Sequence, residues 1–255
     1  AWRAELGERV LAALAPGATS EDCGGIRLRG GHAWCERAMA AQGTVGLSYG
    51  TGVRDVWSEQ LSSAFQVPTQ LFGCAVGPSA SSALAGSAAN GSGTCEGSPC
   101  PCHRVAYRAL RGRPGPEALE SRLRGRGPLS TYLKLSVEGA EWTVLEGLLD
   151  KIPLQDKLRT LDVEFHVGLG LESDSRVSEQ ERLGRRARVL ERLRERFRVI
   201  ASTVESLRQS WRPEEACPGR GCPEPAVHAG GGLGLERFAA SYVHRDLVTA
   251  GRGPM

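Results

Sequence analysis

The chain has 255 residues, of which 40% are apolar and 24% charged, and its formal net charge is +3 at pH 7. This length is enough for one sizeable hydrophobic core, and 33 Gly with 14 Pro stay below the share of roughly a quarter that marks disordered chains. The near balance of charge gives no general attraction to nucleic acid or anionic lipid. No run approaches the roughly 18 apolar residues that a membrane-spanning helix needs.

The N-terminal part predicts a helix and then a strand, helix, strand unit. Apolar residues recur every three or four positions over 2–14, which indicates a helix, and a turn-rich stretch follows to about residue 43. A β-prone run over 44–49 ends at two glycines, and a helical pattern over 55–65 and a second β-prone run over 70–76 come next. This order predicts parallel strands joined by a right-handed crossover.

The middle of the chain carries no clear period. Residues 77–103 are dominated by Gly, Ser, Ala, Cys and Pro, which is typical of an insertion or a long loop. From 104 to 126 seven Arg accompany two Glu, but Tyr107 is the one aromatic residue among them. Because single-stranded nucleic acid needs interleaved aromatic rings for stacking, we interpret this stretch as a solvated connection and find no strong nucleic-acid signal.

Strands and helices alternate again in the C-terminal half. Strand patterns cover 131–137, 158–166, 198–204 and 238–243, helical patterns cover Trp142 to Leu149 and 177–197, and 217–234 is interpreted as a loop. In the run 158–166 the apolar residues occupy one side, whereas Asp162, Glu164 and His166 occupy the other. The alternation predicts an open α/β sheet rather than a barrel of hairpins.

Seven of the eight cysteines fall into three groups, and Cys74 stands apart from them. These are Cys23 with Cys35, then Cys95, Cys100 and Cys102 followed by His103, and finally Cys217 with Cys222. The middle group has enough donors for zinc but lacks paired Cys-x-x-Cys spacing, so local disulfides, free thiols and a zinc site all stay open. We assign no metal ligands, and the cysteines do not indicate a compartment.

Ligands of an open parallel sheet bind at the carboxyl ends of its strands, where three polar segments are expected to converge. These segments are Ser48-Tyr49-Gly50-Thr51-Gly52, Ser136-Val137-Glu138-Gly139 and Glu164-Phe165-His166. A side chain at Gly50 or Gly52 would occupy ligand volume or exclude a positive φ, although a simple strand-ending turn explains both glycines as well.

Three side chains of these segments have alternative roles. The imidazole of His166 is suited to act as a general base, but a hydrogen-bonded structural histidine or a metal ligand paired with Glu164 is also consistent with the pattern. Glu138 either contacts a cofactor or caps the following helix through its dipole.

Several of these segments resemble FkbM-like methyltransferases and the related methyltransferase-like domain proteins. The family has a strand of the form Leu-Lys-x-Asp-x-Glu-Gly followed by Ala-Glu-Trp and a leucine-rich helix, which residues 132–148 match. Further matching segments are 47–58 (the glycine loop), 161–166 (the Glu-x-His strand), 241–245 (the closing strand) and 23–31 with Cys35 (the entry segment). The resemblance covers about 23–247 and is loose over 77–127.

The resemblance implies a Rossmann-like α/β fold with an open, mostly parallel sheet, helices on both faces and an antiparallel C-terminal strand. It implies binding of S-adenosylmethionine and methyl transfer to an O- or N-acceptor, either a small molecule or a glycan-like molecule. The implied cofactor-binding residues are Ser48, Tyr49, Gly50, Gly52, Ser136 and Glu138, and the implied catalytic residues are His166 and Glu164. The expected division is an N-terminal helix and linker over 1–22, a methyltransferase-like domain over 23–247 with a loop insertion at about 77–127, and a tail over 248–255.

The chain departs from the family at two positions. Gly73 and Ser136 each stand where the family usually has Asp, and Gly73 lies about 20 residues after the glycine loop, where an acidic residue normally holds the cofactor ribose. Losing two hydrogen bonds from charged acceptors weakens binding by roughly two to four decades, unless Asp55, Glu59 or Glu138 compensates. The alternative function is therefore a catalytically silent relative that acts as an interaction module.

Overall fold

The computed structural model describes most of the chain. The described residues are 2–29, 32–39, 43–50, 55–74, 94–95, 98–99, 105–110, 116–137, 139–166, 177–203, 228–229, 233–234 and 237–249.

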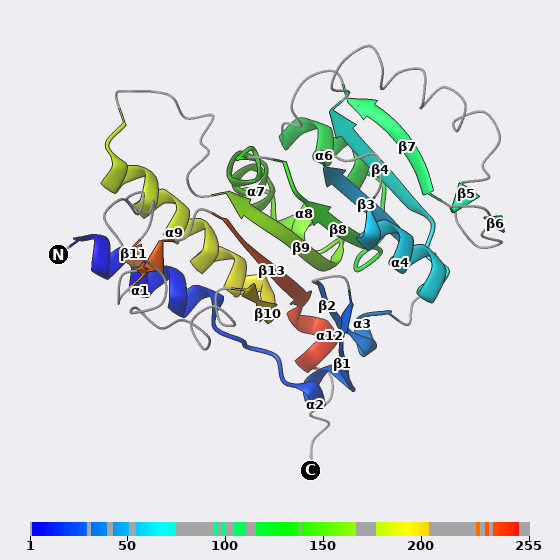
Figure 1. Cartoon of the computed structure of the whole chain (residues 1–255), viewed down its shortest axis with the longest axis horizontal. Helices are drawn as coiled ribbons and strands as arrows, with labels where there is room; N and C mark the ends of the chain where they lie inside the picture. Colours follow the sequence, from blue (N-terminus) through cyan, green and yellow to red (C-terminus); the bar gives the residue numbers. More distant parts are fainter. Residues whose placement is uncertain are drawn as a thin grey trace.

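A seven-stranded sheet forms the centre of the molecule (Figure 1). Its strands, in spatial order, are β10 (Phe197–Ser202), β13 (Arg237–His244), β9 (Leu158–His166), β8 (Thr131–Leu135), β3 (Val45–Gly50), β4 (Thr69–Cys74) and β7 (Val105–Leu110). The pairs from β9 to β7 are parallel, whereas β13 is antiparallel to both β9 and β10. The chain is thus a Rossmann-like α/β protein with an antiparallel C-terminal strand, as predicted.

The direction in which strands are added reverses between β3 and β8. The chain proceeds from β3 to β4 and β7 on one side, and then returns to place β8 and β9 on the other side of β3. Such a reversal opens a crevice at the carboxyl ends of the two central strands, which is where doubly wound sheets bind their ligands.

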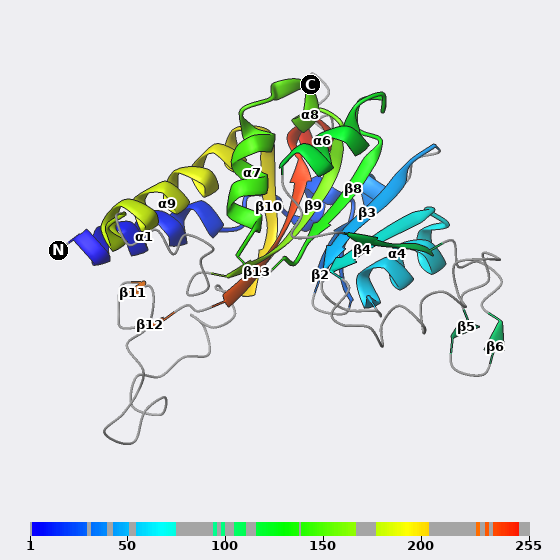
Figure 2. The same cartoon turned by 90° about the horizontal axis from the view of Figure 1, so that it is seen from above.

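Helices cover both faces of the sheet (Figures 1 and 2). One face, which we call the long-helix face, packs against α1 (Trp2–Leu14), α6 (Pro116–Leu123), α7 (Glu141–Leu149) and α9 (Glu179–Arg196). The other, the hairpin face, packs against α4 (Val56–Phe65), α2 (Ser20–Cys23), β1 (Ile26–Arg29), β2 (His32–Cys35), α3 (Glu36–Met39) and α12 (Arg245–Thr249). The short α8 (Ile152–Gln155) follows α7, and two-residue strands pair as β5 (Thr94–Cys95) with β6 (Ser98–Pro99) and as β11 (His228–Ala229) with β12 (Leu233–Gly234).

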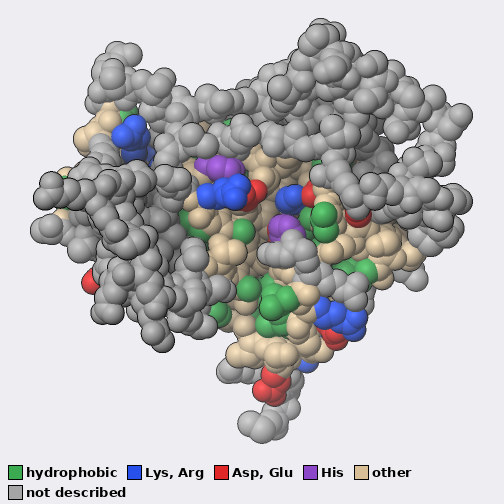
Figure 3. All heavy atoms as spheres, viewed as in Figure 1, with side chains coloured by type: hydrophobic (Ala, Val, Ile, Leu, Met, Phe, Trp, Pro, Cys, Tyr) green, Lys and Arg blue, Asp and Glu red, His purple; other side chains and the backbone are tan. Residues whose placement is uncertain are grey.

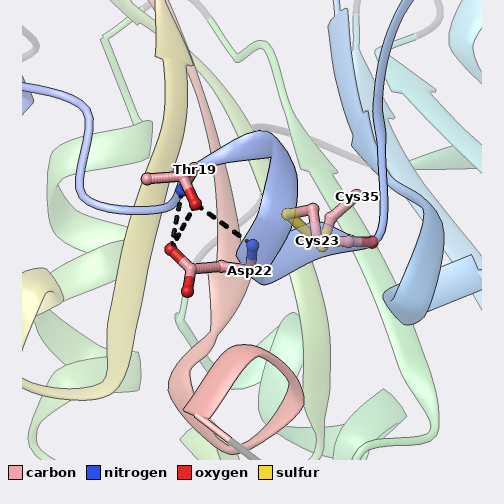
Figure 4. Close-up of a disulfide and its surroundings, with 4 residues drawn as sticks. All are labelled: Thr19, Asp22, Cys23 and Cys35. Carbon is pink, nitrogen blue, oxygen red and sulfur yellow. Dashed lines mark hydrogen bonds between the residues drawn. A yellow bond between two sulfur atoms is a disulfide. The ribbon is translucent and has the colours of Figure 1, made fainter. Parts of the chain in front are cut away.

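The stretch before residue 43 is more ordered than its turn-rich sequence predicts, because it contains α2, the β1–β2 hairpin and α3. Thr19 begins α2 with a capping box, in which its hydroxyl accepts from the Asp22 amide and the Asp22 carboxylate accepts from the Thr19 amide (Figure 4). A buried disulfide between Cys23 and Cys35 joins α2 to β2. Closing a loop of this length stabilises a fold by about 3 kcal/mol, chiefly by restricting the unfolded chain.

The expectation of a solvated connection over 104–126 is wrong for two segments. Residues 105–110 form β7, which pairs with β4 at the edge of the sheet, and residues 116–123 form α6. An edge strand has a single hydrogen-bonded neighbour and needs less apolar character, so its sequence signal is weak. Leu119 and Leu123 of α6 are buried in the core, and the Arg122 guanidinium lies 5.3 Å from the Phe72 ring centroid.

Other expectations fall largely outside the described residues. Most of 77–103 and of the predicted loop 217–234 lies there, and so do Cys100, Cys102, His103, Cys217 and Cys222. The predicted domain limits stay predictions, although α12 runs to Thr249 and Val248 is buried in the core of the hairpin face.

His244, at the end of β13, makes the stability of the fold depend on pH. Its buried ring meets the edge of Phe197, and this burial lowers the pKa of His244 below its ordinary value although Asp246 and Asp156 oppose the shift. The unfolded chain therefore takes up a proton more readily than the folded chain below about pH 6.5. We expect the free energy of unfolding to fall as the pH drops from 7.5 to 5, in urea titrations followed by circular dichroism.

The matched variants are His244→Gln, which removes this titration, and His32→Gln, which leaves it in place. We expect the pH dependence of the urea midpoint to become shallower in His244→Gln than in His32→Gln. Equal slopes in the two variants would contradict the assignment to His244.

Candidate functional site

The carboxyl ends of β3 and β8 meet as the sequence predicts. The Ser136 amide donates a hydrogen bond of 2.8 Å to the Tyr49 carbonyl, and Gly50 is paired with Gly73 of β4. Gly50 and the bend after β8 therefore lie side by side at the carboxyl ends of the central strands, where the strand order reverses. Two of the predicted cofactor residues, Gly52 and Glu138, lie outside the described residues.

Polar side chains form two rows across the hairpin face of the sheet. The strand registers align the first row, which consists of Ser48, Lys134, Asp162 and Ser241. The second row lies two residues further toward the carboxyl ends of the parallel strands. It contains Gly50, Ser136, Glu164 and Ala239. In Figure 3, His, acidic and basic side chains gather in the middle of the view, in the region where Figure 1 draws β9, β8 and β3.

Asp55 holds the first row together on the β3 side. It is the N-cap of α4, and its carboxylate accepts hydrogen bonds from the Ser58 amide at 3.2 Å and from the Ser48 hydroxyl at 2.7 Å, and it pairs with the Lys134 ammonium. Burial opposes the charge, but Lys134 and the two serine hydroxyls outweigh it, so the net effect lowers the pKa of Asp55. The Asp55 carboxylate therefore joins α4, β3 and β8, and its hydrogen-bond partners belong to the protein itself.

Asp162 links neighbouring elements on the β9 side of the sheet, as Asp55 does on the β3 side. Its buried carboxylate accepts hydrogen bonds from the Trp57 indole at 2.9 Å and the Ser241 hydroxyl at 2.5 Å, and His32 Nδ1 lies 3.5 Å from it. The carboxylate thus ties β9 to α4, β13 and the start of β2. The sequence pattern puts Asp162 on the polar side of its strand but does not reveal these partners.

His166 ends β9 beside a buried carboxylate that sequence reasoning missed. Glu141, at the start of α7 and fully buried, accepts hydrogen bonds from the His166 amide at 2.6 Å and the Gly139 amide at 2.8 Å. His166 Nδ1 lies 3.3 Å from the same Glu141 oxygen that binds the amide. If Nδ1 carries the proton, as this contact requires, Nε2 is left as an acceptor. No contact within the described part of the chain engages Nε2.

Glu164 lies in the second row, next to Ser136. The Ser136 hydroxyl donates to Glu164 Oε2 at 2.6 Å, and Arg237 Nη1 lies 2.9 Å from Glu164 Oε1. A carboxylate is therefore present beside position 136 even though that position itself is serine. An aspartate at 136 would face Glu164 with the same charge, which the serine hydroxyl avoids.

Tyr49 and Gly50 are neighbours at the end of β3, but they face opposite sides of the sheet. The Tyr49 ring points to the long-helix face, where it stacks on Phe72 at 4.7 Å, and burial raises the pKa of the phenol to about 12. Gly50 does not have a positive φ, and among the described residues a Cβ added to it would meet just the Ser136 carbonyl oxygen, at 3.9 Å. Within this part of the chain, neither backbone conformation nor packing requires glycine at position 50.

The fold and this edge define a Rossmann-like α/β protein with a candidate ligand site at its topological switch point. Comparison with protein-family models finds no match, and neither does comparison with curated proteins. Among solved structures, the chain is similar to the Methanococcus jannaschii fibrillarin pre-rRNA processing protein, with 8% sequence identity and a TM-score of 0.38 over 93% of this chain and 75% of that chain. Across the described ranges, no helix is long and apolar enough to cross a membrane.

Proposed function

We propose that the protein is an S-adenosylmethionine-dependent methyltransferase of the FkbM-like type, acting on an oxygen or nitrogen of its acceptor. The observation that carries the proposal is the edge shared by Gly50, Ser136 and Glu164, with the Glu141–His166 pair at the end of the same strand as Glu164. The strand, turn and helix segments that resemble the family contribute every one of these residues.

The residues at the edge fit such a cofactor in two respects. Gly50 leaves open the space that a side chain would fill, and Glu164 offers a carboxylate that can receive the ammonium of a methionyl group while Ser136 holds it in place. When bound, S-adenosylmethionine supplies an electrophilic methyl group.

His166 is then the residue that removes a proton from the acceptor. His166 Nε2 would accept the proton that the acceptor oxygen or nitrogen loses on methylation. Glu141 positions the ring by holding Nδ1, and it is itself fixed by the amides of Gly139 and His166. Such orientation of a base by a buried carboxylate keeps the accepting nitrogen aimed in one direction.

A catalytically silent binding module is the second candidate, and the Gly50–Gly73 pair favours it. Neither member of this pair has a side chain, so the carboxylate that normally holds the ribose is absent from the two adjacent strand ends. Weak cofactor binding without methyl transfer is the behaviour expected of such a module.

Calorimetry with S-adenosylmethionine and S-adenosylhomocysteine tests the proposal on matched variants. Gly50→Val fills the space beside Gly50, whereas Gly127→Val adds the same side chain where no atom of the described residues lies within 4 Å. We expect at least about a tenfold weaker binding in Gly50→Val, equivalent to about 1.4 kcal/mol, and wild-type binding in Gly127→Val. Absence of binding heat at millimolar ligand would overturn the proposal. Binding without transfer of labelled methyl to any fraction of a cell extract would favour the silent module.

A further inference from the structure

A hollow of about 220 Å³ lies on the hairpin face, between the β1–β2 hairpin and the strands β10 and β13. Its lining consists of Leu28, Ala33, Ala201, Ser202, Thr203, Ala239 and Ser241. None of these side chains is charged or aromatic. The hollow is separate from the open space beside Gly50, since its residues come from the other half of the sheet.

Two hydroxyls of the lining are already engaged with the protein. Ser241 Oγ donates to Asp162 and accepts from the Ala33 amide at 3.1 Å, and Thr203 Oγ1 accepts from the Ala239 amide at 2.9 Å. A ligand would therefore meet chiefly the methyl groups of the alanines and the side chain of Leu28. Such a surface favours an apolar group, because a group with many hydroxyls would lose its hydration without gaining enough partners.

The size of the hollow limits the group that it can hold. A protein cavity of about 150 Å³ lined by apolar side chains accommodates benzene. A hollow of 220 Å³ accommodates a somewhat larger group, of about seven or eight non-hydrogen atoms. The lining has no aromatic side chain on which a sugar ring could stack, which argues against a glycan.

The hollow shares two of its lining residues, Ala239 and Ser241, with the polar rows of the candidate site. Ala239 is paired with Glu164, and Ser241 is paired with Asp162, on the same face of the sheet. Neighbouring strands lie about 4.8 Å apart, so a ligand over β13 lies about 10 Å from Ser136 on β8. One acceptor molecule of modest length can therefore fill the hollow and still present its reacting atom beside Glu164 and His166.

We infer that this hollow binds the non-reacting end of the methyl acceptor, and that this end is a compact aryl or branched alkyl group. The assignment of the bound molecule as a methyl acceptor rests on the proposed function. Leu28, which is 74% exposed and lies at the hollow, becomes covered when such a group binds. The disulfide between Cys23 and Cys35 holds the hairpin that carries Leu28 and Ala33.

The experiment uses p-cresol as the probe and methyl-labelled alanine as the reporter. We expect p-cresol to shift the ¹³C-methyl signals of Ala33, Ala201 and Ala239 in NMR spectra of the full chain, and methyl α-glucoside to leave them unchanged. Ala239→Leu fills the hollow from a partly exposed strand position, and its spectrum should no longer respond to p-cresol. No shift of these signals up to the solubility limit of p-cresol, or an equal response to the glucoside, would overturn the inference.

A pair of surface variants separates the hollow from general hydrophobic binding. Leu28 and Ile152 are both exposed aliphatic residues, but Leu28 alone of the two lines the hollow. We expect Leu28→Ser to weaken p-cresol binding about fivefold and Ile152→Ser to leave it unchanged. Equal effects of the two substitutions would overturn the site.

The outcome also separates this inference from the proposed function. Because p-cresol binding needs no methyl donor, binding of S-adenosylhomocysteine without any p-cresol response overturns the hollow and leaves the methyltransferase proposal standing. A p-cresol response without binding of S-adenosylhomocysteine leaves a ligand site but overturns its assignment to a methyl acceptor.

Discussion

The His166→Gln variant is expected to lose about two to four orders of magnitude in the rate of methyl transfer, while its binding of S-adenosylhomocysteine stays within about twofold of wild type. Glutamine cannot accept a proton as imidazole Nε2 does, yet it has a similar size and retains the backbone amide that donates to Glu141. The measurement is a single-turnover assay with radiolabelled methyl donor, paired with calorimetry. A wild-type rate would remove His166 from the reaction.

Glu141→Gln tests how His166 is positioned. Because Glu141 accepts two amide hydrogen bonds and faces Nδ1, the substitution changes the charge beside the ring while keeping the volume of the side chain. The ring of His166 then loses the anionic acceptor that faces Nδ1, so we expect the single-turnover rate of methyl transfer to fall by about tenfold to a hundredfold while the affinity for S-adenosylhomocysteine stays unchanged. A merely structural role would lower the folded fraction, so the rate and the number of binding sites would fall together.

The polar side of β9 could be predicted from the sequence because it depends on a period of two. Alternation over 158–166 separates Asp162 and Glu164 from Val163 and Phe165, and the structure places them on opposite faces. The ends of the strands could also be predicted from local sequence, because a glycine or the start of a helical pattern follows them. A rule based on local spacing thus identified which residues lie at the edge of the sheet.

The partners of these residues could not be predicted in this way. Glu141 and His166 are 25 positions apart, and Trp57 and Asp162 are 105 apart, so no local period links them. The β1–β2 hairpin was missed for a related reason. Its strands are four residues long and are surrounded by glycines, and its place is fixed by a disulfide and by contacts with β10 and β13.

These long-range contacts explain how the site tolerates a row of buried polar groups on a sheet. Asp55 binds across β3, β8 and α4, and Asp162 binds across β9, β13 and α4, so each carboxylate has several donors rather than one. A buried charge is costly unless it is paired and hydrogen-bonded. The two aspartates therefore hold the strands in register immediately below the row that faces the candidate ligand.

The Asp55→Ala variant should show the largest loss of stability, about 3–5 kcal/mol in the free energy of unfolding at pH 7. The substitution removes the N-cap of α4 and leaves the Lys134 ammonium, whose side chain is 16% exposed, without its partner. Because the pKa of Asp55 is lowered in the folded protein, its contribution is fully present at pH 7 and is lost as the pH falls below about 4.

Urea unfolding of four proteins checks the cause of this loss: wild type, Asp55→Ala, Lys134→Met and the double variant. If an unpaired buried charge is the main cost, the double variant should be more stable than Asp55→Ala, because Met fills the space of Lys134 without a charge to satisfy. Glu120→Ala is the control, since its pair with Lys151 lies at the surface and should leave the urea midpoint unchanged. Additive losses in the double variant would contradict the coupling between Asp55 and Lys134, and with it the role of this pair in joining the two strands that border the candidate cofactor site.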